Sequence, residues 1–334
     1  MTTSQQWKNR KVLVTGGGGF IGSHLVERLV ELGAQVTAFL RYNAATSHGL
    51  LEALPLPARE KVQCVYGDLC DPYSLNAVPD DIDTVFHLAA IIAIPYSYLQ
   101  PAQVAENNIR STLSVLEWCR RQKHLRRLVH TSSSEVYGTA QQDFITEAHP
   151  QEAQSPYAAS KIACDKLAQS YHLSFELPVV TLRPFNTYGP RQSARAIIPT
   201  IITQALTQDK VFLGAQHPTR DFTYVADTVD AFIRIAETEG IEGRTYHIGS
   251  GREISIGQLA DRIIPLTGRE VPVVFDPLRI RPTASEVNRL ICDASRAQAD
   301  LQWQPGTTLD DGLTQTIEWV GRNLRGYRPE RYTV

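Results

Sequence analysis

The sequence predicts an α/β chain in which a doubly wound parallel sheet is followed by a smaller C-terminal α/β lobe. Short apolar runs alternate with helical patterns through the first half of the chain, and the first of these runs ends in a glycine cluster. Beyond Pro184 the chain changes to segments punctuated by proline and arginine. Near-continuous apolar strands that alternate with helices are typical of a parallel sheet covered on both faces.

The individual elements follow from the same patterns. Residues 11–15 form the first expected strand, and apolar residues at helical spacing between 21 and 30 predict a helix that ends at Gly33. A helix at 229–236 and a strand at 245–248 return the chain to the main sheet. The remaining expected strands lie at 35–40, 62–66, 84–88, 127–131 and 179–183, and the remaining expected helices at 105–121 and 157–173.

The length of 334 residues fits about two domains. We assign residues 1–182 and 219–250 to a first domain built on the sheet, and residues 183–218 and 251–334 to a second, smaller domain. No repeat or flexible linker separates the two domains, so we expect them to pack together with a ligand-binding cleft between them.

Composition and charge exclude several classes of function. The 33 basic and 35 acidic residues leave a formal charge of -2, which provides no excess of positive charge for binding nucleic acid or a membrane surface. The five cysteines are scattered and form no Cys-x-x-Cys pair, which argues against a disulfide framework and a metal site. Residues 1–11 lack the pattern of a secretion signal and no apolar run is long enough to span a membrane, so we expect a cytoplasmic protein.

The glycine cluster predicts a dinucleotide site. It lies between a strand and a helix, where a tight turn lets backbone N–H groups approach a pyrophosphate at the helix N-terminus. Two registers fit the cluster, Gly17, Gly19 and Gly22 or Gly16, Gly19 and Gly22. The glycine turn by itself does not show which of the two registers is used.

The second strand ends without the carboxylate that would accept the ribose hydroxyls of NAD. Arg41 stands there instead, which favours NADP mildly, although Arg41 as a solvated surface residue beside NAD is a nearly equal interpretation. Asp68, after the third strand, is spaced to meet the adenine or to serve as a structural turn residue.

A phenol and an ammonium lie on one helical face at Tyr157 and Lys161, four residues apart. A neighbouring cation, together with the charge of a nicotinamide, lowers the pKa of a tyrosine toward the range of a useful base. The pair alone is common at chance spacing. Its combination with the upstream glycine turn and the serine run at 132–134 indicates a catalytic site.

Nearly the whole chain resembles the extended short-chain dehydrogenase/reductase family of nucleotide-sugar enzymes, whose first domain is a Rossmann domain. The resemblance is carried by the glycines 16, 19 and 22, by 87–90, Asn108 and 132–134, and by Tyr157 with Lys161 and 183–186. It implies the glycine register 16, 19, 22 and a triad of Ser133, Tyr157 and Lys161. It also implies a cofactor site, for which we expect Gly16, Gly19, Phe20, Ile21, Gly22, Arg41, Asp68, Leu69, Ala89, Ala90, Asn108, Tyr157, Lys161 and Pro184.

The carboxylate after the serine run identifies the reaction that the resemblance favours. In nucleotide-sugar 4,6-dehydratases of the family, the positions of Ser133, Ser134 and Glu135 carry Thr, then Asp or Ser, then Glu. The resemblance implies that Tyr157 deprotonates the sugar 4-hydroxyl while hydride leaves C4 for the nicotinamide. Glu135 then removes the C5 proton, water leaves from C6, and the hydride returns to C6. Because Ser134 stands where some relatives have a general-acid Asp, Glu135 or a relayed water would protonate the leaving hydroxyl.

Other functions remain open at this point. A 4-epimerase needs no C5 base, and a uronate decarboxylase needs a cationic site such as Arg191 or Arg195 near the hexose. Glu135 as a structural carboxylate fits the decarboxylases, which resemble the same string. A dinucleotide-sensing scaffold without turnover is a non-enzymatic alternative, but it leaves Ser133, Tyr157 and Lys161 without a purpose.

The substrate side of the resemblance lies in the second half of the chain. It implies that Asn186, Arg191, Arg220, Arg281 and Glu286 bind the nucleotide diphosphate and ribose, with a surface ion pair as the alternative for each arginine. The strings at 39–43 with 47–51, at 92–98 and at 191–200 resemble the subgroup that dehydrates N-acetylglucosamine carried on UDP or GDP. Tyr96 and Tyr98 either contact the hexose or pack in the protein. The family also implies a homodimer formed through helices 105–121 and 157–173.

Overall fold

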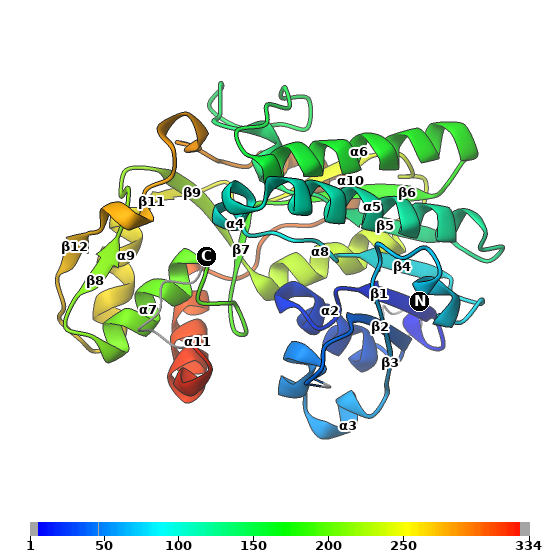
Figure 1. Cartoon of the computed structure of the whole chain (residues 1–334), viewed down its shortest axis with the longest axis horizontal. Coiled ribbons are helices and arrows are strands. Elements are labelled where there is room, and N and C mark those ends of the chain that lie inside the picture. Colours follow the sequence, from blue (N-terminus) through cyan, green and yellow to red (C-terminus); the bar gives the residue numbers. More distant parts are fainter. Residues whose placement is uncertain (1–5, 46, 328–334) are drawn as a thin grey trace.

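The computed structural model describes residues 6–45 and 47–327, and it confirms the doubly wound α/β fold. A seven-stranded sheet has the order β10-β6-β5-β4-β1-β2-β3, and every pair of neighbouring strands in it is parallel. Figure 1 shows α5 and α6 on one side of this sheet and α2 and α8 on the other. Two small sheets, β11-β9-β7 and β12-β8, complete the strands of the described part.

The strands of the main sheet are short and mostly buried because helices cover both faces of the sheet. They are β1 (Lys11–Thr15), β2 (Gln35–Arg41), β3 (Val62–Gly67), β4 (Thr84–His87), β5 (Arg127–Thr131), β6 (Val179–Pro184) and β10 (Thr245–Ile248). The small sheets contain β7 (Asn186–Tyr188), β8 (Val211–Leu213), β9 (Thr219–Tyr224), β11 (Glu253–Ser255) and β12 (Val273–Phe275).

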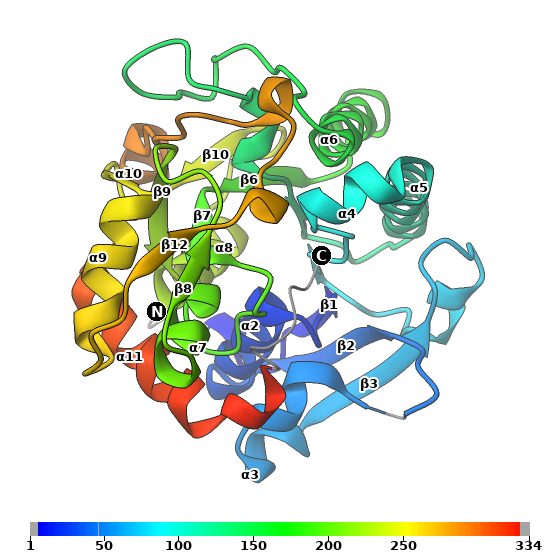
Figure 2. The ribbon, with the colours of Figure 1, turned by 60° about the vertical axis from the view of Figure 1, so that its left-hand side comes forward.

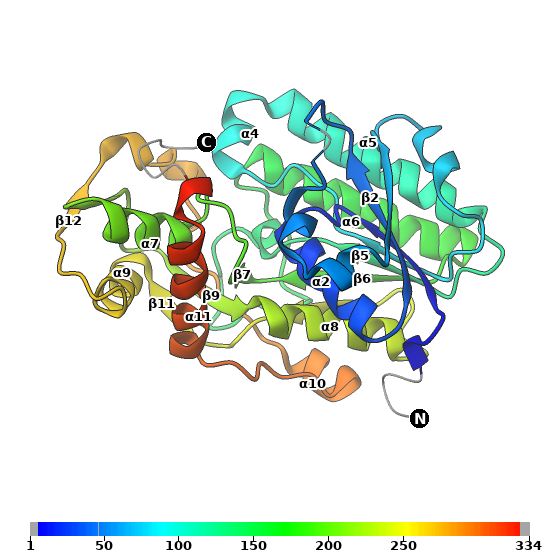
Figure 3. The same cartoon turned by 90° about the horizontal axis from the view of Figure 1, so that it is seen from below.

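The helices divide between the main sheet and the smaller lobe. Those around the sheet are α2 (Phe20–Glu31), α3 (Leu56–Arg59), α4 (Ile94–Leu99), α5 (Pro101–Arg120), α6 (Pro156–Phe175), α8 (Val225–Glu237) and α10 (Ser295–Leu301). Those of the smaller lobe are α7 (Ile197–Thr207), α9 (Ile256–Leu266) and α11 (Leu309–Arg322), which Figures 2 and 3 show grouped with β8 and β12 beside the sheet. Single 3-10 turns that matter for the site are η1 (Gly49–Ala53), η3 (Ser134–Tyr137) and η5 (Thr283–Ser285).

The topology changes one detail of the predicted domain division. Strand β10 joins the main sheet beside β6, as expected, but β9, which we assigned to the first domain, is the central strand of the small sheet β11-β9-β7. The two domains therefore interleave at 219–224. The remaining boundaries stay predictions, and residues 1–5, 46 and 328–334 of the assigned ranges lie outside the described residues.

The structure also bears on the cysteines and on membrane-spanning helices, which the sequence analysis considered. All five cysteines are free thiols, three of them buried. Over 6–45 and 47–327, no helix combines the length and the apolar character that crossing a membrane requires.

Candidate active site

The glycine turn is built by close backbone approach. Gly16 has φ +71°, and a Cβ at this position would lie 2.9 Å from the Ala89 amide nitrogen. A Cβ on Gly22, the third residue of α2, would lie 2.2 Å from the Gly16 carbonyl oxygen. These two positions therefore require glycine. This contact between Gly16 and Gly22 agrees with the register 16, 19, 22.

The start of α2 fits a dinucleotide pyrophosphate. Gly19 is the N-cap residue, no side chain caps the helix, and the first turn contains no acidic residue. No capping side chain therefore occupies the free amide groups of the first turn, and no carboxylate there would repel a bound anion. Phe20 and Ile21, the first two helical residues, are half-buried at the same end.

The adenosine side of the turn contains the residues expected from β2 and β3. Arg41 is exposed at the end of β2, in register with Gly67 at the end of β3. Asp68 is exposed, and its Oδ1 accepts a hydrogen bond from the Cys70 amide at 2.9 Å, so this carboxylate also shapes its own turn. Leu69, by contrast, is buried in the hydrophobic core, which removes most of its surface from any cofactor contact.

A contact that our sequence analysis missed covers the glycine turn. The Leu50 amide of η1 donates to the Gly18 carbonyl at 2.9 Å. Gly49 has φ +65°, and a Cβ there would lie 2.6 Å from the same carbonyl oxygen. The segment after β2 is therefore folded back on the turn, and the glycine at 49 was the signal for this contact.

Asn108, which we expect at the cofactor site, is buried and hydrogen-bonded within the protein. Its side chain is 1% exposed, its Oδ1 accepts from the Ile91 amide at 2.8 Å, and its Nδ2 donates to the Ile91 carbonyl and the Ser160 hydroxyl, each at 3.0 Å. The polar atoms of Asn108 are thus used within the protein. Asn108 ties α6 to the loop that contains the half-buried Ala89 and Ala90, and its role at the cofactor site stays a prediction.

The predicted catalytic residues lie on η3 and at the start of α6. Ser133 caps η3, where its Oγ accepts from the Glu135 amide at 3.2 Å, and Ser134 and Glu135 are buried at the start of that turn. Ser155 caps α6, and Pro156 is the first helical residue, so the helix begins immediately before Tyr157. Lys161, also buried, donates from Nζ to the Thr131 carbonyl at 2.6 Å.

The pKa of Tyr157 differs from the sequence-based expectation. Burial raises it well above the usual range, the charge of Glu135 raises it further, and a hydrogen bond with the Ser133 side chain acts in the opposite direction. The chain alone therefore holds Tyr157 as a neutral phenol. The free-energy cost of burying a phenolate is larger than the stabilisation that the Ser133 hydrogen bond gives to it. The same interactions show that Ser133, Glu135 and Tyr157 share one buried site.

The predicted phosphate-binding arginines converge. One Nη atom of Arg220 lies 3.3 Å from Glu286 Oε1, and one of Arg281 lies 3.4 Å from the same oxygen. Burial and the charge of Arg281 lower the pKa of Arg220, whereas the charges of Glu135 and Glu286 raise it. Arg220 therefore contacts Glu286 and is close enough to Glu135 for the charge of that carboxylate to act on its pKa, which brings the expected diphosphate site near the predicted catalytic residues.

The other residues expected to bind substrate, Asn186 and Arg191, do not form an ion pair with Glu286. Asn186 is half-buried at the start of β7, two residues after Pro184, which is half-buried at the end of β6. Arg191 does not join the arginine cluster. Its Nη2 lies 2.6 Å from Glu27 on α2, and its guanidinium lies over the Trp319 ring of α11 at 5.8 Å from the centroid. Arg191 therefore links α2 to the smaller lobe, and its role in substrate binding stays a prediction.

A buried polar network behind the site was not predicted. Asp165, two turns after Tyr157 on α6, accepts from Arg183 Nη2 at 2.8 Å and pairs with His130 Nε2 at 3.2 Å. Arg183 also donates to the Tyr137 hydroxyl, and His247 Nε2 lies 2.6 Å from that hydroxyl. Tyr137 is the last residue of η3, so the network connects the turn that carries Glu135 with the helix that carries Tyr157.

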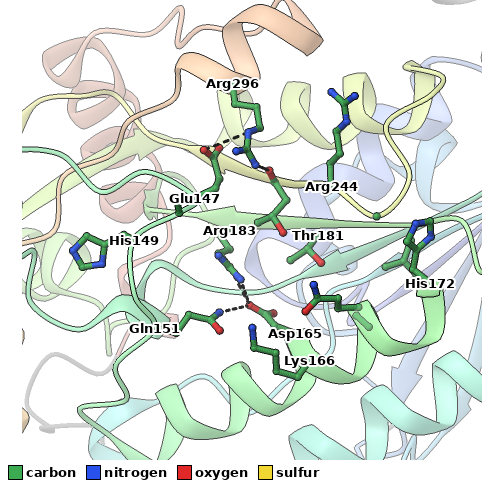
Figure 4. A pocket seen from close by; sticks show the side chains of 16 residues that line it. Glu147, His149, Gln151, Asp165, Lys166, His172, Thr181, Arg183, Arg244 and Arg296 are labelled. Carbon is green, nitrogen blue, oxygen red and sulfur yellow. Dashed lines mark hydrogen bonds and ion pairs between the residues drawn. The ribbon is translucent and has the colours of Figure 1, made fainter. Parts of the chain in front are cut away.

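A cavity of about 540 Å³ reaches this network from the protein surface. Figure 4 shows Asp165 between Arg183 and Gln151, with Glu147 and Arg296 paired above them. The charged groups that line the cavity are largely paired with one another. This cavity contains none of the predicted catalytic or substrate residues, and those lie nearer the other end of η3 and the start of α6.

Comparison with known proteins gives the same family that the motifs suggest. The family model described as GDP-mannose 4,6 dehydratase matches residues 13–316. The dTDP-glucose 4,6-dehydratase of Mycolicibacterium smegmatis is 34% identical over 329 residues, which cover 97% of each chain.

Solved structures agree with both dehydratases and epimerases. The epimerase Mth375 of Methanothermobacter thermautotrophicus has a TM-score of 0.89 at 29% identity and covers 97% of this chain and 96% of its own. The dTDP-glucose 4,6-dehydratase DesIV of Streptomyces venezuelae, which contains NAD, has a TM-score of 0.86 at 29% identity and covers 96% of this chain and all of its own.

Proposed function

We propose that this chain, which belongs to the extended short-chain dehydrogenase/reductase family of nucleotide-sugar dehydratases and epimerases, is a nucleotide-sugar 4,6-dehydratase. The observation that carries the proposal is the position of Glu135. This buried carboxylate is near enough to Tyr157 and to Arg220 for its charge to act on the pKa of both groups. These interactions support Glu135 as the base for C5, with Tyr157 as the base for the 4-hydroxyl and Arg220 among the diphosphate-binding arginines.

The residues divide the reaction among them. Tyr157, hydrogen-bonded to Ser133, would accept the proton of the 4-hydroxyl as a phenolate, which the positive charge of a bound oxidised nicotinamide and the Lys161 ammonium would favour. Lys161 would hold the ribose of the nicotinamide, and the cofactor site would supply an acceptor for the C4 hydride and a donor of that hydride to C6. The 4-ketone acidifies the proton on C5, which Glu135 removes as the C6 hydroxyl leaves as water. Protonation of that leaving group falls to Glu135 or to a water near Ser134.

The nicotinamide cofactor fits the glycine turn, where Gly16, Gly19 and Gly22 would hold the pyrophosphate and Ala89 and Ala90 would line the adjoining loop. The exposed Arg41 and the absence of a carboxylate at the end of β2 favour NADP, whereas the similar structure of DesIV contains NAD. Mass spectrometry of the cofactor released from the purified protein distinguishes the two.

The substrate is a hexose on a nucleoside diphosphate. Two of the relatives described above act on dTDP-glucose by their names. The strings at 39–43 with 47–51, at 92–98 and at 191–200 resemble instead the subgroup that acts on N-acetylglucosamine carried on UDP or GDP. We propose these as the two substrate classes to separate by experiment, with Arg220 and Arg281 on the diphosphate of either one.

The test is incubation of the purified protein with UDP-, GDP-, dTDP- and CDP-hexoses in deuterated water, followed by mass spectrometry and NMR. Loss of water with deuterium at C5 is the expected result, and the sugar that reacts identifies the substrate. A change of configuration at C4 alone would indicate the second candidate, a 4-epimerase, which the similarity to Mth375 favours. Loss of carbon dioxide would indicate a decarboxylase, although Arg191 is engaged by Glu27.

We also propose that the protein is a cytoplasmic homodimer formed through α5 and α6. These helices pack side by side (Figure 1), and they expose Leu113, Leu173 and Phe175. Sedimentation equilibrium of the purified protein is the test. A monomer at micromolar concentration would contradict the proposal.

A further inference from the structure

The two tyrosines of α4 have different hydrogen-bond partners. The Tyr96 hydroxyl donates to Gln103 on α5, within the same domain. The Tyr98 hydroxyl lies 2.7 Å from the Ser285 hydroxyl, 187 residues away in η5. Tyr98 therefore makes a bond between two segments that are distant in the sequence, and Tyr96 does not.

Ser285 is held from a second side. Its hydroxyl donates to the backbone carbonyl of Gln154, and the Gln154 side chain donates from Nε2 to the Ala284 carbonyl at 3.3 Å. Because a serine hydroxyl has one hydrogen to donate and a carbonyl only accepts, Tyr98 is the donor in its bond with Ser285. Gln154 directly precedes Ser155, the residue that caps the helix carrying Tyr157.

The bond joins two segments that adjoin the residues of the proposed substrate site. On one side, α4 follows the loop at 89–91 that Asn108 holds against the cofactor site. On the other side, Arg281 and Glu286 flank η5 and meet Arg220. Figure 2 shows the segment after β12 running from the smaller lobe toward α4 and the start of α6. A sugar joined to a diphosphate held by Arg220 and Arg281 would lie beneath this bridge, next to Glu135 and Tyr157.

We propose that Tyr98 and Ser285 form a clasp that keeps the oxidised sugar in the site until the reaction is complete. The inference rests on the proposed dehydratase function. Oxidation at C4 removes two electrons and two hydrogens from the sugar, one as hydride and one as the proton taken by Tyr157. A sugar lost at this stage leaves as a 4-ketone that still has its C6 hydroxyl, and its hydride stays behind. Each such loss therefore stops that protein molecule.

The first test needs neither cofactor turnover nor knowledge of the natural sugar. Hydrogen–deuterium exchange of the peptide covering 277–286 is compared between the wild type, Tyr98→Phe and Ser285→Ala, with UDP, GDP or dTDP present. Removal of one bridging hydrogen bond is expected to accelerate exchange about 2- to 10-fold. Tyr96→Phe is the matched control, because its bond lies outside the bridge, and it is expected to leave the exchange of this peptide unchanged.

The second test follows the sugar. In the clasp variants, a fraction of the substrate is expected to leave as the 4-ketone with its C6 hydroxyl intact, and reduced nicotinamide absorbance is expected to accumulate in proportion. The double variant Tyr98→Phe/Ser285→Ala is expected to leak no more than Ser285→Ala alone, since Ser285→Ala already removes the bond with Tyr98 together with the bond from Ser285 to the Gln154 carbonyl.

The outcomes separate the clasp from the function on which it rests. Unchanged exchange in both single variants, or a wild-type enzyme and variants that release equal amounts of intact 4-ketone, would overturn the clasp while leaving the dehydratase in place. A wild type that dehydrates no nucleotide sugar would overturn the proposed function, and with it the retention role of the clasp. Faster exchange in the clasp variants, together with their release of the intact 4-ketone, supports the clasp.

Discussion

Replacement of Asp165 by asparagine tests whether the buried network behind the site holds the structure together. Asp165 is 4% exposed. Its Oδ2 accepts from Arg183 Nε at 3.0 Å and Nη2 at 2.8 Å, and from Gln151 at 3.3 Å, while Oδ1 pairs with His130. The substitution keeps the shape and one acceptor oxygen but removes the only negative charge in direct contact with the buried guanidinium of Arg183 among the described residues.

The expected cost is large because Arg183 would remain charged in the interior. Its remaining side-chain partner is the uncharged Tyr137 hydroxyl. Breaking a buried pair in this way costs about 3–5 kcal/mol of unfolding free energy. Asp310→Asn is the matched control, since Asp310 and Arg262 form an ion pair at 2.5 Å with both side chains about half exposed. An exposed pair of this kind contributes about 0–1 kcal/mol.

The assay is equilibrium unfolding in urea for the wild type and both variants at neutral pH and again in acid. Burial by itself would raise the pKa of Asp165, but the His130 hydrogen bond and the Arg183 charge lower it to about 2 from the ordinary 3.8. Because the folded-state pKa is the lower one, the stabilisation is full above about pH 4 and is lost as the pH falls toward about 2. The gap between the wild type and Asp165→Asn is therefore expected to narrow over that range.

Two results would refute this reasoning. The first is a loss of less than about 1 kcal/mol in Asp165→Asn at neutral pH, indistinguishable from the exposed control. The second is a gap between the wild type and Asp165→Asn that stays constant between about pH 4 and about pH 2, which would mean that Asp165 does not titrate with a lowered pKa.

Three further predictions concern the site. Glu135→Gln is expected to permit oxidation at C4 but to slow water loss by about 100- to 10,000-fold, measured as deuterium incorporation at C5; undiminished dehydration would remove Glu135 from the mechanism. Tyr157→Phe is expected to retain bound cofactor, detected by absorbance, while turnover falls by at least about 100-fold; near-normal turnover would mean that another group is the base. Gly22→Ala is expected to abolish cofactor binding, measured by calorimetry, and to lower the unfolding free energy by about 1–3 kcal/mol, because the new Cβ would lie 2.2 Å from the Gly16 carbonyl oxygen. Gly321→Ala on α11 is the control, since a Cβ there meets nothing within 4 Å, and it is expected to bind the cofactor normally.

The local sequence determined the elements and the chemistry carried by short spacings. The turn from β1 to α2 is set by glycines that a side chain cannot replace, and the apolar strands are short runs that only a two-sided sheet can bury. Tyr157 and Lys161 lie on one face of α6 because residues four apart always do. The Ser133 to Glu135 string is likewise contiguous, so η3 carries all of its groups to one place.

The tertiary structure alone decided which distant side chains meet. Arg191 and Arg220 are both arginines near the substrate lobe, yet one pairs with Glu27 on α2 and the other meets Glu286. Arg220 lies near the start of β9, whereas Arg191 follows the end of the neighbouring parallel strand β7, so the two side chains lie at opposite ends of this strand pair. Burial outweighed the Ser133 hydrogen bond in setting the pKa of Tyr157. The bond between Tyr98 and Ser285 spans 187 residues. No periodicity or spacing encodes such a pair, since the distance between two side chains that far apart in the sequence depends on how whole elements pack.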